Sequence, residues 1–238
     1  MRQVKITIGR LLCAWAFSFF SFVNPALAQT DARAILDGIR VAQGQLHQEL
    51  TGRLRLADGT AIPFGLRLEG NQLAYEFKDP KEVITLNLGE TGSQLRDETK
   101  SGTQRLSGAR LLQPVRNSDL TYEDISLRFI YWNRAVVEGE QQVKTLTCWM
   151  ILVQPPPGES SQYGSVRLWV QKEGGALMRA EGFDRQRRPL KRFELVSGQK
   201  INGKWWLKQM RIERFDPQTQ RVLSRTYLEI NPPADQST

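Results

Sequence analysis

Apolar and polar residues alternate along most of the chain after residue 50, and this period of two predicts β-strands. In the first half, the apolar positions of four such runs are Leu50, Leu54 and Leu56; Ile62, Phe64, Leu66 and Leu68; Leu73, Tyr75 and Phe77; and Ile84, Leu86 and Leu88. Asp58-Gly59 and Gly70-Asn71 separate the runs with residues typical of tight turns. The pattern predicts an up-and-down meander with one apolar face.

The second half continues the pattern, with one run expected at residues 127–132 that continues past Asn133 over 135–138. Further strands are expected at residues 142–153, 166–170, 177–183, 190–196, 205–215 and 222–230. The run 142–153 is apolar on both faces, so it needs cover on both sides of the sheet. Turns are expected at residues 155–158, 197–198 and 202–203. Residues 90–110 are polar and rich in glycine, so strands there should be weak. The total is about ten or eleven strands.

Two segments depart from this alternation. Residues 31–46 place apolar side chains three and four positions apart, which predicts an amphipathic helix. Residues 117–125 contain the N-cap types Ser118 and Asp119, and Thr121 with Asp124 has the spacing of a capping box. A short helical insert between two β runs is either a crossover connection or a lid on a sheet.

These elements define a mainly β protein with helices (α+β). A meander of 10–11 antiparallel strands must curl or split. In a curled sheet with the helices packed against its concave face, the apolar side of the 31–46 helix and both apolar faces of the 142–153 strand can be buried.

The first residues read as a targeting segment. Arg2, Lys5 and Arg10 precede an apolar stretch at residues 11–23, and Ala26-Leu27-Ala28 matches a small-x-small cleavage site. The apolar stretch is shorter than the ~20 residues that a membrane span needs. We therefore expect residues 1–28 to be a cleaved signal peptide, residues 29–230 to be one domain in the periplasm, and residues 231–238 to be a flexible tail. Cleavage would lower the net charge from +8 to +5, because it removes three basic residues and no acidic one.

Candidate catalytic groups are scarce. His47 is the only histidine, and Cys148 would be the only cysteine after cleavage, inside an apolar run typical of a buried, inert thiol. Glu123 and Asp124 are adjacent, and a favourable charge at a helix N-terminus explains them. The sequence predicts no enzyme, no metal and no cofactor, although a carboxylate pair assembled from distant strands stays open.

Basic residues gather at positions 185–192, namely Arg185, Arg187, Arg188, Lys191 and Arg192. Two interpretations stand: a surface for anionic headgroups or an acidic partner, and a solvated hairpin tip that protects a strand edge from aggregation. Nucleic-acid binding is not expected of an exported chain.

Four motifs in the second half resemble one family. The segment Ser118-Asp119-Leu120-Thr121-Tyr122-Glu123-Asp124 is similar to the S-D-x-S/T-Y-E-D segment of the outer-membrane lipoprotein-sorting proteins, relatives of the periplasmic carrier LolA. Residues 163–169, residues 181–184 and Asn202-Gly203-Lys204-Trp205 resemble further motifs of that family. The resemblance covers residues 110–230 well and residues 30–110 only by pattern. It fails at residues 176–182, where the family has a proline near Met178 and an aromatic residue at Gly182.

The resemblance implies an unclosed antiparallel β half-barrel with an N-terminal helix, a central helical lid and an apolar cavity that carries the acyl chains of a lipoprotein or lipid. Residues that would line the cavity or its lid are Leu54, Leu56, Phe64, Leu66, Tyr75, Phe77, Ile84, Leu86, Leu120, Tyr122 and Ile125. The alternative for each is simple packing against the helices, because alternation reports only the buried face. A movable lid around Tyr122 is a hypothesis.

The expected partners are an acylated lipoprotein or lipid ligand and inner- or outer-membrane proteins, with the protein itself a monomer. A second function stays open: a non-catalytic sensor or assembly module of an envelope complex that docks a protein partner through the same half-barrel.

Overall fold

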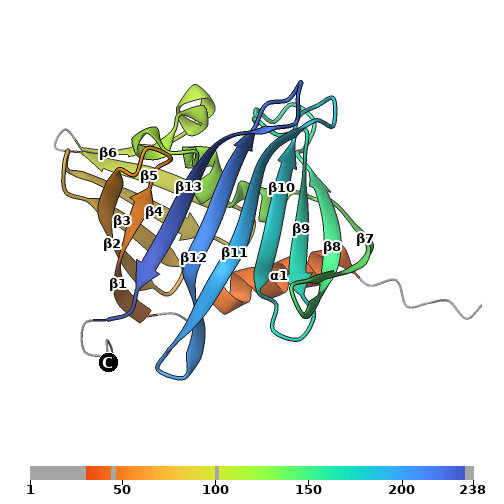
Figure 1. The fold of residues 1–238 in the computed structure, drawn as a ribbon, viewed down its shortest axis with the longest axis horizontal. Coiled ribbons are helices and arrows are strands. Elements are labelled where there is room, and N and C mark those ends of the chain that lie inside the picture. The colour runs from red at the N-terminus through yellow and green to blue at the C-terminus, as the bar shows by residue number, and fades with distance from the viewer. Residues whose placement is uncertain (1–30, 44–46, 100–101, 234–238) are drawn as a thin grey trace, which may run out of the picture.

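The computed structural model describes residues 31–43, 47–99 and 102–233, and its strands form one curled sheet (Figure 1). The 13 strands lie in the order β6-β5-β4-β3-β2-β1-β13-β12-β11-β10-β9-β8-β7, and every neighbouring pair is antiparallel. The strands are β1 (His47–Arg55), β2 (Ala61–Glu69), β3 (Gln72–Phe77), β4 (Glu82–Leu88), β5 (Ser93–Thr99), β6 (Gly102–Arg105), β7 (Arg134–Val143), β8 (Leu146–Gln154), β9 (Ser165–Gln171), β10 (Leu177–Phe183), β11 (Pro189–Ile201), β12 (Lys204–Phe215) and β13 (Val222–Asn231).

The sheet is open, with β6 and β7 as its two edges. Strands that follow one another along the chain lie side by side, except β6 and β7 at the two edges. The last strand, β13, also returns to pair with β1 at Leu54↔Leu228. This pairing joins an N-terminal meander to a C-terminal one. The predicted unclosed antiparallel half-barrel is confirmed.

Helical turns fill the gap between the two edges. They are η1 (Gly108–Leu112), η2 (Val115–Asn117), α2 (Tyr122–Ile125) and η3 (Arg128–Tyr131). The tyrosine hydroxyls of this segment reach the first meander: Tyr122 donates to Glu82 on β4 and Tyr131 donates to the carbonyl of Gly89. The helical segment therefore covers the β3–β5 side of the sheet.

The N-terminal helix α1 (Ala32–Gln43) packs against β7 and η3. Its stripe is buried at Ala32, Leu36 and Ile39, as the periodicity predicted, and these residues join the main core. Within the part of the chain that the structure describes, no helix is both long and apolar enough to cross a membrane. The predicted signal peptide, most of the predicted tail and the last three residues of the predicted helix 31–46 lie outside the described residues.

Strand β8 is apolar on both faces, as predicted, and each face has its own cover. Ile151 and Val153 are completely buried in the main core on the concave side. Cys148 faces the other way, in a small cluster with Val143, Trp169 and Met178. Its thiol is fully buried, and burial raises its pKa.

Several predicted elements differ from the structure. Residues 93–99 and 102–105, where strands were expected to be weak, form β5 and β6, so the described residues contain 13 strands in place of ten or eleven. Residues 128–131 are a 3-10 turn where a strand was predicted, because Leu127 enters the left-handed region at φ 52° and starts a tight turn. The run 142–153 breaks at Lys144, also left-handed, into the β7–β8 hairpin. Ser197-Gly198 is a bulge inside β11 and not a turn, whereas Asn202-Gly203 is a hairpin turn as predicted.

The arginines of the outer face are mostly paired across strands. Glu194 on β11 pairs with Arg179 on β10 and Arg211 on β12, and Glu213 on β12 pairs with Arg225 on β13. Such a network neutralises much of the basic charge of the sequence through ion pairs within the sheet.

Candidate functional site

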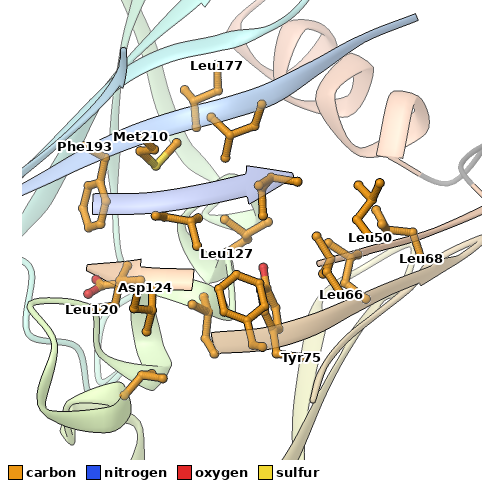
Figure 2. Close-up of a pocket in the computed structure, with 18 of the residues that line it drawn as sticks. Leu50, Leu66, Leu68, Tyr75, Leu120, Asp124, Leu127, Leu177, Phe193 and Met210 are labelled. Atoms are coloured by element: carbon orange, nitrogen blue, oxygen red, sulfur yellow. The ribbon is translucent and has the colours of Figure 1, made fainter. Parts of the chain in front are cut away.

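An apolar cavity of about 320 Å³ lies between the curled sheet and the helical segment. Its walls come from β1, β2 and β3 on one side and from β10–β13 on the other, and part of the helical segment closes it (Figure 2). The cavity exists because β13 pairs with β1, which curls the second meander around to face the first.

Seven of the eleven residues predicted to line a cavity or lid lie on this cavity: Leu54, Phe64, Leu66, Tyr75, Phe77, Leu120 and Ile125. The aromatic members pack together, with the Phe64 ring 5.9 Å from that of Tyr75 and 5.8 Å from that of Phe77. The alternation along β1–β3 identified these residues because the apolar, buried face of these strands is also the concave face that lines the cavity.

The other four lie elsewhere. Ile84 and Leu86 on β4 are completely buried in the main core and do not line the cavity. Leu56 follows the end of β1 and borders a separate polar hollow that contains Asp119 and Lys191. Tyr122 is buried, and its hydroxyl is 2.6 Å from Glu82 on β4.

The sequence prediction missed the far wall of the cavity. This wall includes Leu177, Phe193, Met210, Leu228, Trp205 and Trp206. The predicted strands include these positions, but the adjacent Trp205 and Trp206 do not alternate as the residues of β1–β3 do. What the pattern could not show is that the two meanders face each other.

The cavity wall offers few polar groups. The Tyr75 hydroxyl points toward the cavity (Figure 2), and burial raises the pKa of Tyr75 to about 12, so the hydroxyl is a neutral donor. The indole nitrogen of Trp206 is buried and has no hydrogen-bond partner among the described residues. Such a lining suits a long apolar ligand that has one or two hydrogen-bond acceptors.

Among the described residues, Asp124 is the only charged one on the lining, and its carboxylate is already satisfied. Lys191 Nζ lies 2.6 Å from Oδ2, and Oδ1 accepts from the Tyr163 hydroxyl at 2.5 Å and from Gln162 Nε2 at 3.1 Å. The backbone N–H of Thr121 also donates to Oδ2 at 2.7 Å. A carboxylate held by so many donors is a structural group.

The predicted capping box is confirmed. Asp124 N–H donates to Thr121 Oγ1 at 3.3 Å, and Thr121 N–H donates back to the Asp124 carboxylate. The cap begins α2, a helix of only four residues that its own hydrogen bonds would not hold in water. Its stability must come from tertiary contacts.

The other acidic side chains of the motif supply those contacts. Asp119 accepts from the Thr226 hydroxyl on β13 at 2.9 Å and from Arg214 Nε on β12 at 3.2 Å. Glu123, with only 1% of its surface exposed, accepts from the backbone N–H of Gln162 at 2.9 Å. The motif therefore fastens the helical segment to the sheet and to the 155–164 loop, and its residues act as anchors.

The departure from the family pattern at Gly182 has a local explanation. A Cβ at this position would lie 2.1 Å from the Tyr163 ring, so the absent side chain leaves the space that the ring occupies. Tyr163 is fully buried, and burial together with the neighbouring Asp124 raises its pKa well above the usual range.

Gly182→Ala should lower the free energy of unfolding by about 1–3 kcal/mol, because the displaced ring strains the packing and loses its hydrogen bond to Asp124. Urea denaturation of the two proteins measures the difference. Gly65→Ala is the matched control, since a Cβ there meets its nearest atom at 3.6 Å. Equal losses in the two variants would show that Tyr163 does not depend on Gly182.

The basic side chains predicted to cluster at 185–192 point in different directions in the structure. Lys191 points inward to Asp124, and Arg192 pairs with Glu181 on the outer face. Arg188 is exposed but pairs with Asp184 within the turn, so Arg185 and Arg187 are the members without an ion pair among the described residues. His47 is exposed at the first residue of β1.

The fold and the cavity together define this chain as a LolA-like half-barrel, and solved structures agree. It matches a putative outer membrane lipoprotein-sorting protein domain from Vibrio parahaemolyticus (TM-score 0.64, 15% identity, covering 84% of this chain and 92% of that one). It also matches a LolA superfamily protein from Nitrosomonas europaea (TM-score 0.60, 17% identity, 84% and 91%) and a DUF1329 family protein from Desulfovibrio piger (TM-score 0.58, 22% identity, 84% and 91%). At these identities the likeness establishes the fold.

At the level of sequence, a family model described as "-like: Uncharacterized protein" matches residues 99–237. The match spans more than half of the chain, so the protein belongs to that family. No curated protein matches the sequence.

Proposed function

We propose that this protein is a non-catalytic periplasmic carrier that shelters an acyl chain of a lipid or lipoprotein in its cavity. The observation that supports this most strongly is the lining itself: its walls are almost entirely hydrocarbon and aromatic, and the one carboxylate on them is neutralised by Lys191. A cavity of this kind has little use except to remove an apolar group from water.

The size and energetics fit such a cargo. The cavity volume of about 320 Å³ is at the lower end of ligand-binding cavities, which span roughly 300–1,000 Å³. Burying an acyl chain contributes about 0.8 kcal/mol per methylene, so a long chain gains on the order of 10 kcal/mol before the costs of binding. The free Tyr75 hydroxyl can donate to the carbonyl oxygen at the head of the chain.

A role in outer-membrane lipoprotein sorting is the more specific form of the proposal. It is supported by the shared fold of the putative outer membrane lipoprotein-sorting protein domain from Vibrio parahaemolyticus, and by the resemblance of residues 118–124 to the sorting family. In this form the cargo is an acylated lipoprotein that the protein passes between envelope partners.

Affinity for saturated fatty acids should rise with chain length from octanoate toward palmitate, by up to about fourfold per methylene, and then level off once the cavity is full. Displacement of a fluorescent fatty acid from the purified protein measures the series. An affinity that does not depend on chain length would show that the cavity does not take up the chain.

A further inference from the structure

The hairpin of β11 and β12 projects beyond the strands on either side of it. Strand β10 pairs with β11 only as far as Glu194, and β13 pairs with β12 only from Gln209 onward. The ladder partners of residues 198–207 therefore lie within this stretch, which the turn at Asn202-Gly203 closes and which extends past the sheet (Figure 1). At its base Ser197 pairs with Gln209, and Gln199 Nε2 donates to the carbonyl of Ile230 on β13 at 3.0 Å. We call residues 197–208 the hairpin tip.

The tip combines an exposed aromatic ring with unpaired cations. Trp205 is 73% exposed, the largest exposure among the described bulky apolar residues, and Lys200 Nζ lies 5.3 Å from the centre of its ring. Lys204 and Lys208 are exposed too, and within the described chain none of the three lysines pairs with a carboxylate. No acidic residue occurs between Glu194 and Glu213, and both of those are held by arginines.

We propose that the hairpin tip docks the protein on the surface of an anionic phospholipid bilayer. Tryptophan favours the interface between headgroups and acyl chains, where its ring is buried and its N–H stays hydrated. Lysines beside it are attracted by the negative surface potential of anionic lipids. The tip presents both groups on a narrow projection that reaches an interface without a change in the sheet.

A bilayer suits this projection better than a protein does. A stable protein interface buries roughly 800 Å² on each partner, whereas Trp205 is the one exposed bulky apolar residue among the described residues of the tip. A membrane needs no complementary shape, and a single inserted ring flanked by cations is enough to bind to it favourably. The basic tip also contrasts with the outer face, whose arginines are mostly neutralised by glutamates of neighbouring strands.

Docking at this place would bring the cavity to the membrane. Trp205, Trp206 and Leu207 belong to the tip and also to the cavity lining. An acyl chain could then pass between bilayer and cavity along an apolar path. The docking surface itself does not rest on what the cavity binds, so the two proposals can fail separately.

Co-sedimentation of the ligand-free protein with vesicles tests the docking. We expect binding to vesicles in which one third of the phosphatidylcholine is replaced by phosphatidylglycerol, and weaker binding to phosphatidylcholine alone. The variant Lys200→Gln/Lys204→Gln/Lys208→Gln should bind the anionic vesicles on the order of 100-fold more weakly, at about fivefold per lysine. Trp205→Ala should weaken binding roughly tenfold, and lipids brominated on their acyl chains should quench the fluorescence of the wild-type protein more than that of this variant.

Matched controls remove the same groups from the opposite end of the strands. Arg185→Gln/Arg187→Gln/Arg221→Gln loses the same charge, and Leu223→Ala loses an apolar side chain that is 54% exposed. Neither control should change vesicle binding. Equal losses in the lysine and arginine variants would show that binding follows net charge alone, and unchanged binding in the Trp205 and lysine variants would overturn the proposal. A Trp205→Ala variant that changes only the oligomeric state would identify the tip as a self-contact, which would also overturn it.

Discussion

Lys191→Met is expected to lower the free energy of unfolding by about 3–5 kcal/mol, because it leaves the buried Asp124 carboxylate without its counter-ion. The side chains of Asp124 and Lys191 are 1% and 6% exposed, so water cannot replace the lost ammonium. The remaining donors to Asp124 are neutral. Since Asp124 also caps α2 and holds Tyr163, the helical segment should loosen along with it. Urea denaturation monitored by tryptophan fluorescence measures the loss.

Lys208→Met is the matched control, since Lys208 is exposed on β12 and pairs with no described carboxylate. Its effect should lie within about 0.5 kcal/mol of zero. The double variant Asp124→Asn/Lys191→Met should recover part of the loss, because no unpaired charge is then buried. A Lys191→Met variant as stable as the wild-type protein would contradict the anchoring role of the motif.

Met210→Glu is expected to weaken the binding of a fluorescent fatty acid by at least about 100-fold. Met210 projects into the cavity from β12 (Figure 2). A carboxylate at this place can stay hydrated while the cavity holds water, but an acyl chain would have to strip that water away. Removing a charge from water without a partner costs several kcal/mol, which is the source of the predicted loss. Titration of the probe into each protein gives the affinities.

Met210→Leu keeps the volume and the apolar character, so its affinity for the probe should stay close to that of the wild-type protein. The circular dichroism spectra of the two variants should agree, which separates a blocked cavity from a misfolded sheet. A probe that binds Met210→Glu as tightly as Met210→Leu would place the acyl site somewhere other than this cavity.

The sequence predicted the strands well where one face is buried and the other solvated. The meander β1–β4, the Asn202-Gly203 turn and the capping box at Thr121 and Asp124 all depend on local spacing, and all are present. The errors came where long-range packing overrides local composition. Strands β5 and β6 are polar, yet they form by extending an existing sheet, and the 3-10 turn at 128–131 has the same apolar content as a strand.

The cavity could be predicted only in part, because it is formed by two segments far apart in the chain. Leu54 on β1 faces it in register with Leu228 on β13, a partnership that alternation cannot reveal. The same limit applies to the basic residues at 185–192. In the sequence they form one cluster, but adjacent residues on a strand point to opposite faces of the sheet. Lys191 is a buried anchor and Arg192 an outer-face partner. The gating role suggested for Tyr122 stays a hypothesis, while the contacts of its segment assign it an anchoring role.

Native mass spectrometry of the protein purified from its own cells tests the central claim most directly. The proposed carrier should appear with an added mass that matches an acylated ligand, and the Met210→Glu variant purified in the same way should appear without it. A wild-type protein that carries no acylated ligand and co-purifies only with a protein partner would contradict the carrier function. That result would favour the sensor or assembly module as the role of this half-barrel.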